Sequence, residues 1–163
     1  MRTPLVARWV SAVLLALTAA LPAAALGDEV GDGIRATLAL STRSLARRAR
    51  AALERKYPDE DWGAYGFPRY VFTNEPTTTA YRIAVKEPAT LVAATCACFC
   101  DEMGHTTLTH CFLKDGRPTS GFDDHAAGCN ICVRQALLAF LWAELGADHA
   151  EIRQAMRDAF GAP

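Results

Sequence analysis

The chain has no cysteine before Cys96, and this absence excludes a lipid attached to a cysteine near the N-terminus. It also has no Arg-Arg pair ahead of its first apolar run, Val10–Leu21, which favours the general secretion route. That run falls short of the about 20 apolar residues that a bilayer-spanning helix needs. A membrane-spanning anchor is therefore not expected.

The sequence has no excess of positive charge. It contains 17 Lys and Arg against 18 Asp and Glu, a formal net charge of −1 at pH 7. Domains that bind nucleic acid carry a basic patch or stripe, so this composition excludes nucleic acid as an expected partner. The sequence also lacks a phosphate-binding loop and a pattern for serine-nucleophile chemistry, and we expect no enzymatic activity.

The first 27 residues have the pattern of a secretory signal peptide. Two arginines precede or flank the apolar run, and Ala-x-Ala-like cleavage patterns follow it at 23–25 and 25–27. We expect residues 1–27 to be removed on export, which leaves one domain, 28–163, in the periplasm or outside the cell. No stable membrane anchor would remain after this cleavage.

Helical spacing of apolar residues is found in five segments, at 32–56, 76–86, 89–94, 130–145 and 148–160. Asp148 and Glu151 resemble a capping box. The first helix and an aromatic loop make up 28–75, where a short strand at 70–73 is an open alternative, and a cysteine-rich module follows at 76–163. The expected fold class is mainly α: a small helical domain with a Cys/His-rich loop region clamped between helices.

All six cysteines fall in one stretch, as C-x-C-x-C, a fourth cysteine after ten residues, and a C-x-x-C pair. They are Cys96, Cys98, Cys100, Cys111, Cys129 and Cys132. Three histidines, His105, His110 and His125, lie among them. The stretch has little periodicity, and a loop of about 30 residues without internal support is uncommon in a compact domain. We therefore expect the cysteines to be cross-linked, by metal or by sulfur.

Thiolates and imidazoles are the ligands that soft and borderline metal ions prefer. A tetrahedral zinc site needs four ligands, and this cluster offers more, which favours Cu(I) coordination or more than one ion. The expected ligands are the six cysteines with His105 and His125, whereas His110 is expected at the surface. The expected function is that of an exported, non-enzymatic protein that binds copper or zinc and keeps it or passes it to a metal-accepting exported protein.

The C-x-x-C pair, Cys129 and Cys132, falls at the expected start of a helix. The helix dipole and the unpaired amides there favour thiolate, so we expect both thiols to ionise readily. Asp123 and Asp124 stand just before His125, where they would orient its ring. The alternative is a loop turn with exposed acidic side chains.

Two other functions remain open. Six is an even number, and export permits oxidation, so the cysteines would form a structural disulfide framework with fifteen possible pairings. Bridges within C-x-C are strained, which favours pairing of the first three cysteines with the other three. Alternatively, the C-x-x-C pair would exchange disulfides as an oxidoreductase, although no strand–helix alternation surrounds it. A c-type haem is disfavoured because Val133, not histidine, follows Cys132.

Several short matches occur in the order of a known family. They are Tyr81-Arg82-Ile83-Ala84, Pro88, Thr95-Cys96-Ala97-Cys98-Phe99-Cys100, Gly104-His105, Cys111-Phe112, Asp124-His125, Gly128-Cys129, Ile131-Cys132 and Glu151-Ile152-Arg153. From about Pro76 to Gly161 the chain resembles a bacterial family of exported proteins and lipoproteins named for a Pro-Cys-Tyr-Cys-Gly-Cys motif. Thr95, Ala97 and Phe99 stand where the motif has Pro, Tyr and Gly. The resemblance implies an exported metal-binding module and no defined activity.

Overall fold

The computed structural model describes residues 23–98 and 104–161, and this part of the chain is mainly helical, as predicted. Most of the expected signal peptide, and Cys100, lie outside the described residues. The helices are α1 (Ala23–Leu38), α2 (Thr42–Lys56), α3 (Glu75–Lys86), α4 (Pro88–Val92), α5 (Asn130–Glu144) and α6 (His149–Phe160). Among the described residues, no helix combines the length and the apolar character needed to cross a bilayer.

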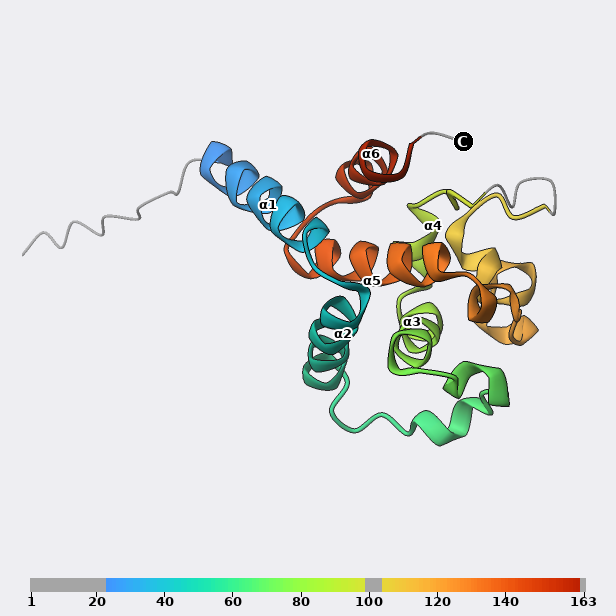
Figure 1. Cartoon of the computed structure of the whole chain (residues 1–163). Helices are drawn as coiled ribbons and strands as arrows, with labels where there is room; N and C mark the ends of the chain where they lie inside the picture. The colour runs from blue at the N-terminus through green and yellow to red at the C-terminus, as the bar shows by residue number, and fades with distance from the viewer. Residues whose placement is uncertain (1–22, 99–103, 162–163) are drawn as a thin grey trace, which may run out of the picture.

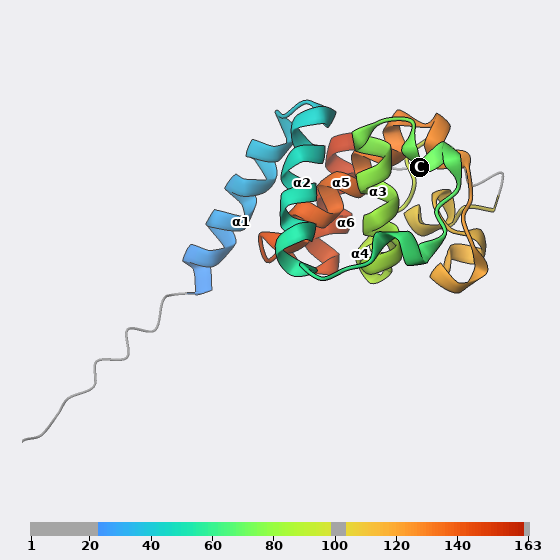
Figure 2. The same cartoon turned by 90° about the horizontal axis from the view of Figure 1, so that it is seen from below.

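Helix α5 is the centre of the fold and contacts each of the other five helices (Figure 1). Helices α2 and α3 lie side by side against one side of α5, and α6 lies on the other (Figures 1 and 2). Every residue from Gln135 to Trp142 is buried. A helix that is apolar on all its faces belongs in the interior, which explains why this segment and not an amphipathic one occupies the centre.

The helix predicted at 32–56 is two helices, and this prediction was wrong in its continuity. The chain leaves the helical conformation between Leu38 and Thr42, and the Ser41 hydroxyl caps α2 by accepting the Ser44 amide at 3.2 Å. The guanidinium of Arg134, on α5, donates to the carbonyl oxygens of Leu38 and Leu40, each at 2.9 Å. Leu38 is the last residue of α1 and Leu40 lies in the break after it, so a side chain from a distant helix pairs carbonyl groups that the break exposes.

The aromatic loop between α2 and α3 covers the core. It forms two 3₁₀ turns, Trp62–Tyr65 and Arg69–Phe72, and the second replaces the strand considered at 70–73. The ring of Phe67 lies 5.6 Å from that of Tyr65 and 4.9 Å from that of Phe122. Stacked and tilted aromatic pairs at these centroid distances are favourable, so the rings tie this loop to the cysteine-rich region.

The remaining helices begin and end close to their predicted residues. The predicted capping box of α6 is present, since the Asp148 carboxylate accepts the Glu151 amide and the Glu151 carboxylate accepts the Asp148 amide. Helix α3 begins at a side-chain cap that the sequence analysis did not use, in which the Asn74 carbonyl oxygen accepts the Thr77 amide at 2.9 Å. Capping residues of these types satisfy amides that the helix itself leaves unpaired.

Replacement of the α3 cap gives a direct measure of its contribution. Asn74→Ala is expected to lower the free energy of unfolding by about 1 kcal/mol, because the buried Thr77 amide loses its acceptor. Urea denaturation followed by tryptophan fluorescence measures this loss. Asn74→Asp keeps an acceptor at the same place and is expected to stay close to the wild type. Equal losses in both variants would show that the cap bond is not the cause.

The Cys/His-rich region lies between α4 and α5, as predicted, and is built from short 3₁₀ turns (Figure 1, yellow to orange). Its chain doubles back at an isolated antiparallel bridge between Leu113 and Phe122. It is attached at both ends to the helices: the Leu108 amide donates to the Ala94 carbonyl at 2.8 Å, and the Tyr81 hydroxyl donates to the Asp123 carbonyl at 2.7 Å. These bonds hold the region against α3 and against the residues that follow α4.

Candidate metal centre

The described cysteines gather at the N-terminal end of α5. Cys129 is the residue that caps this helix, and Cys132 lies in its first turn with no exposed surface. Cys96 and Cys98 follow α4, and Cys111 ends the 3₁₀ turn Leu108–Cys111. Segments more than thirty residues apart thereby bring their sulfurs together, as the cross-linking argument from the sequence predicted.

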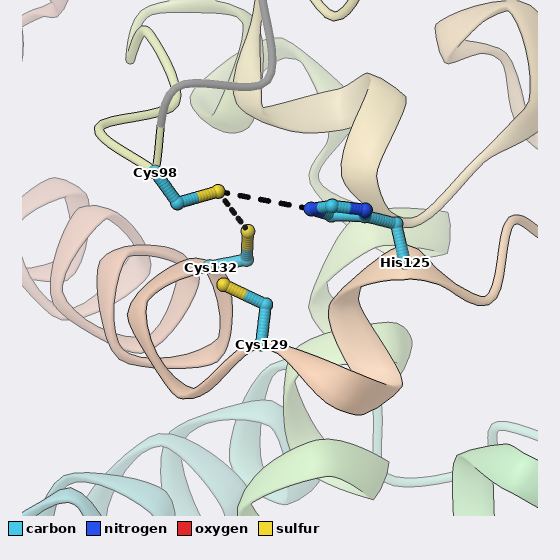
Figure 3. A group of neighbouring side chains, drawn as sticks. All are labelled: Cys98, His125, Cys129 and Cys132. Atoms are coloured by element: carbon cyan, nitrogen blue, oxygen red, sulfur yellow. Dashed lines mark hydrogen bonds between the residues drawn. The ribbon is translucent and has the colours of Figure 1, made fainter. Parts of the chain in front are cut away.

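Four residues from three segments form one possible set of ligands, which we call the outer group: Cys98, His125, Cys129 and Cys132 (Figure 3). Their ligand atoms all lie within 4.8 Å of one another. The sulfur of Cys98 is 3.3 Å from that of Cys132 and 3.7 Å from Nε2 of His125. Metal–sulfur bonds of about 2.3 Å place two sulfurs of a tetrahedral site roughly 3.8 Å apart. Small side-chain movements therefore suffice to surround one ion.

Three buried cysteines form a second set, which we call the inner group: Cys96, Cys111 and Cys132. Their sulfurs also lie within 4.8 Å of one another, and those of Cys96 and Cys132 are 3.5 Å apart. Cys132 belongs to both groups. The sulfur of Cys96 is in addition 3.0 Å from that of Cys98, so the two groups form one continuous cluster.

Three sulfur pairs in the cluster are contacts and not disulfide bonds. The sulfur of Cys98 lies 3.0 Å from that of Cys96 and 3.3 Å from that of Cys132, and the sulfurs of Cys96 and Cys132 are 3.5 Å apart. An S–S bond measures about 2.05 Å. The three spacings are those of sulfur hydrogen-bond contacts, and the sulfurs of Cys98 and Cys132 point toward each other (Figure 3).

Two thiols of the inner group, those of Cys96 and Cys132, have opposite pKa shifts. Hydrogen bonds from the Cys111 and Cys132 thiols hold the pKa of Cys96 well below its usual range. The hydrogen bonds of Cys132 with Cys111 and Cys96, together with its burial, raise the pKa of Cys132 well above its usual range. The contacts among these thiols therefore favour the thiolate form at Cys96 over Cys132. This direction is opposite to the one expected for Cys132 from its place at the start of a helix, and its causes are the neighbouring thiols and burial.

The two predicted histidine ligands are placed differently. His125 belongs to the outer group, whereas His105 belongs to neither group within the described residues. The ring of His105 meets that of His125 edge-on, with centroids 5.2 Å apart, and its Nδ1 is buried with no hydrogen-bond partner in the described structure. His110 is half-buried and not fully at the surface, with Nδ1 3.0 Å from the Thr107 hydroxyl.

One of the two acidic residues before His125 bonds its backbone. The Asp123 carboxylate accepts the backbone amide of His125 at 2.9 Å, and Asp124 is exposed. The bond fixes the start of the 3₁₀ turn His125–Gly128, and with it the position from which the imidazole reaches Cys98. Asp123 thus positions the histidine through the main chain, and the structure gives it no bond to the ring.

A glutamine that the sequence analysis missed holds the C-x-C segment in place. Gln135 is fully buried on α5; its amide oxygen accepts the Ala97 amide at 3.1 Å and its amide nitrogen donates to the Thr95 carbonyl at 3.2 Å. These are the two residues on either side of Cys96. A glutamine inside an otherwise apolar helical run was the available signal, because buried polar side chains need partners.

One of the comparisons with known proteins identifies a family. The sequence model described as a protein of unknown function with PCYCGC motif matches residues 59–162, and it includes every described residue of the outer and inner groups. The match begins before Pro76, so the family domain includes part of the aromatic loop that packs on the cysteine-rich region. Neither the curated proteins nor the solved structures contain a match to the chain. The chain therefore belongs to the family of proteins of unknown function with the PCYCGC motif.

Proposed function

We propose that the chain is an exported, non-catalytic protein that binds a soft metal ion in its Cys/His cluster and keeps it or passes it to a metal-accepting exported protein. Cu(I) is the first choice and Zn(II) the second. The observation that carries this proposal is the convergence of Cys98, His125, Cys129 and Cys132, whose ligand atoms all lie within 4.8 Å of one another. Three sulfurs and one imidazole are a ligand set that both ions accept.

The fit of the described residues to a metal is supported by the chemistry of the cluster. The sulfur of Cys98 lies 3.0 Å from that of Cys96 and 3.3 Å from that of Cys132. The first turn of α5 adds backbone amides that stabilise negative charge on these sulfurs. A cation would replace the thiol protons of the sulfurs that bind it. The export proposal depends on the sequence pattern of residues 1–27, and delivery to a partner depends on the half-exposed ligands of the outer group.

The test is to purify the protein from its export compartment, measure bound metals by elemental analysis, and titrate free thiols in denaturant. Stoichiometric copper or zinc together with titratable thiols is the expected result. A protein that contains no metal, has almost no titratable thiol, and takes up no Cu(I) or Zn(II) after reduction would contradict the proposal. That outcome would favour the disulfide framework.

A pair of histidine variants makes the test specific to the site. His125→Ala removes one ligand of the outer group, whereas His149→Ala removes an exposed histidine in the first turn of α6. Loss of a residue that only supports a ligand costs about 10–100-fold in metal affinity, so loss of His125 itself is expected to cost at least that much. His149→Ala is expected to bind as the wild type does. Equal affinities in the two variants would exclude the outer group.

A further inference from the structure

We propose that the cluster holds two Cu(I) ions at once, one in the outer group and one in the inner group, bridged by the sulfur of Cys132. This inference rests on the proposed function and deepens it by giving the number of ions and the place of each. It follows from how the ligands divide into two sets, from the difference in their burial, and from the position of the sulfur that they share.

The number of ligands exceeds what one ion takes. The outer group supplies three sulfurs and one nitrogen, and the inner group adds the sulfurs of Cys96 and Cys111. A single ion bound by Cys98, His125, Cys129 and Cys132 already has the four ligands of a tetrahedral site. Cys96 and Cys111 would then remain buried beside it with no cation of their own. A second ion between them and Cys132 uses every sulfur of the two groups.

The inner group suits Cu(I) in particular. Its three side chains are buried, with 5% of Cys96 and none of Cys111 or Cys132 exposed. Three thiolates without an oxygen or nitrogen ligand form a soft, three-coordinate set, which Cu(I) accepts. Zinc normally takes a fourth ligand, and water, the usual fourth ligand where the protein supplies three, has little access to these buried sulfurs. The inner group therefore favours the monovalent ion.

The outer group is the more accessible of the two. Cys98, His125 and Cys129 are half-buried, and only Cys132 is fully buried. An ion in this position can exchange ligands with a donor or an acceptor, while the inner ion is shielded. We infer that the outer group exchanges its ion more rapidly than the inner group does.

Cys132 is placed to bind both ions. Its sulfur lies 3.3 Å from the sulfur of Cys98 on one side and 3.5 Å from that of Cys96 on the other. A thiolate sulfur has more than one lone pair and can bridge two soft ions. Thiolates without cations are costly in a buried site, and each Cu(I) offsets part of that negative charge. Binding displaces thiol protons to solvent and changes no oxidation state.

The test is an anaerobic titration of the reduced, metal-free protein with Cu(I), in competition with a chromophoric Cu(I) chelator. The wild type is expected to withhold two equivalents per chain from the chelator. Cys111→Ser is expected to withhold one, in the outer group, and the double variant His125→Ala, Cys129→Ser is expected to withhold one, in the inner group. Cys132→Ser should withhold less than one, and the control His149→Ala should withhold two.

Each outcome decides a different statement. One equivalent in the wild type overturns the two-ion inference and leaves the proposed function standing, whereas no binding in the wild type overturns both. Two equivalents retained by Cys111→Ser overturn the inner group. X-ray absorption of the loaded wild type gives an independent reading, because a bridged pair produces copper–copper scattering that isolated ions lack. Circular dichroism confirms that each variant remains helical before it is titrated.

Discussion

Replacement of Tyr81 by alanine is expected to lower the free energy of unfolding by about 3–5 kcal/mol, the range for removal of a buried aromatic side chain. Tyr81 lies on α3 with no exposed surface. Its ring packs edge-on against Phe112 at a centroid distance of 5.1 Å, and its hydroxyl donates to the Asp123 carbonyl at 2.7 Å. The side chain therefore joins the helical core to the loop that carries His125.

The contributions of packing and of the hydrogen bond can be separated with Tyr81→Phe. This variant keeps the ring and removes only the hydroxyl, so it is expected to cost about 1–2 kcal/mol, because the Asp123 carbonyl loses its donor. Urea unfolding at pH 7, followed by tryptophan fluorescence, measures both variants. A loss below about 1 kcal/mol for Tyr81→Ala would show that the loop packs independently of α3.

The pH at which this prediction is tested matters. Burial raises the pKa of Tyr81 well above its usual range. A group whose pKa is higher in the folded state contributes its full stability below the unfolded value, about 10 for tyrosine, and loses it as the pH rises. At pH 7 the hydroxyl is fully protonated in both states, so the difference between the variants measures packing and hydrogen bonding alone.

The helices could be predicted wherever the local pattern and the tertiary contacts agree. Helix α5 follows the apolar pattern predicted at 130–145, and α6 begins at the capping box predicted at Asp148. The break between α1 and α2 could not be predicted in the same way. It depends on Arg134, which lies about 95 residues further along the chain and bonds the carbonyls of Leu38 and Leu40. Local periodicity carries no information on such a contact.

The site was predictable in composition but not in arrangement. The spacing of the cysteines indicated that they meet, and the five described cysteines do meet. Spacing alone does not say which way each side chain turns, so the division into an outer and an inner group sharing Cys132 had to come from the structure. His105 was predicted as a ligand, but its ring lies beside that of His125 and outside both groups. Sequence spacing could not show this either, because it does not give the direction of a side chain.

Replacement of Gln135 by leucine is expected to weaken Cu(I) binding by about 10–100-fold, the usual cost of removing a group that orients a ligand. The Gln135 side chain bonds the Thr95 carbonyl and the Ala97 amide, and so holds the main chain on both sides of Cys96. Leucine has a similar size but no polar atom. It would leave both backbone groups buried without these partners, and the segment that carries Cys96 and Cys98 would move to find others.

The measurement is the same chelator competition, with Gln154→Leu as the matched control, because Gln154 is exposed on α6 and lies in neither group. The control is expected to bind as the wild type does. Gln135→Glu keeps the acceptor for the Ala97 amide but loses the donor to the Thr95 carbonyl, so its affinity should fall between the two. If Gln135→Leu is folded and binds as tightly as the control, the position of Cys96 depends on the sulfur cluster itself. A small loss in Gln135→Glu and a larger one in Gln135→Leu, with none in the control, would instead establish that α5 sets the metal geometry through this one buried amide.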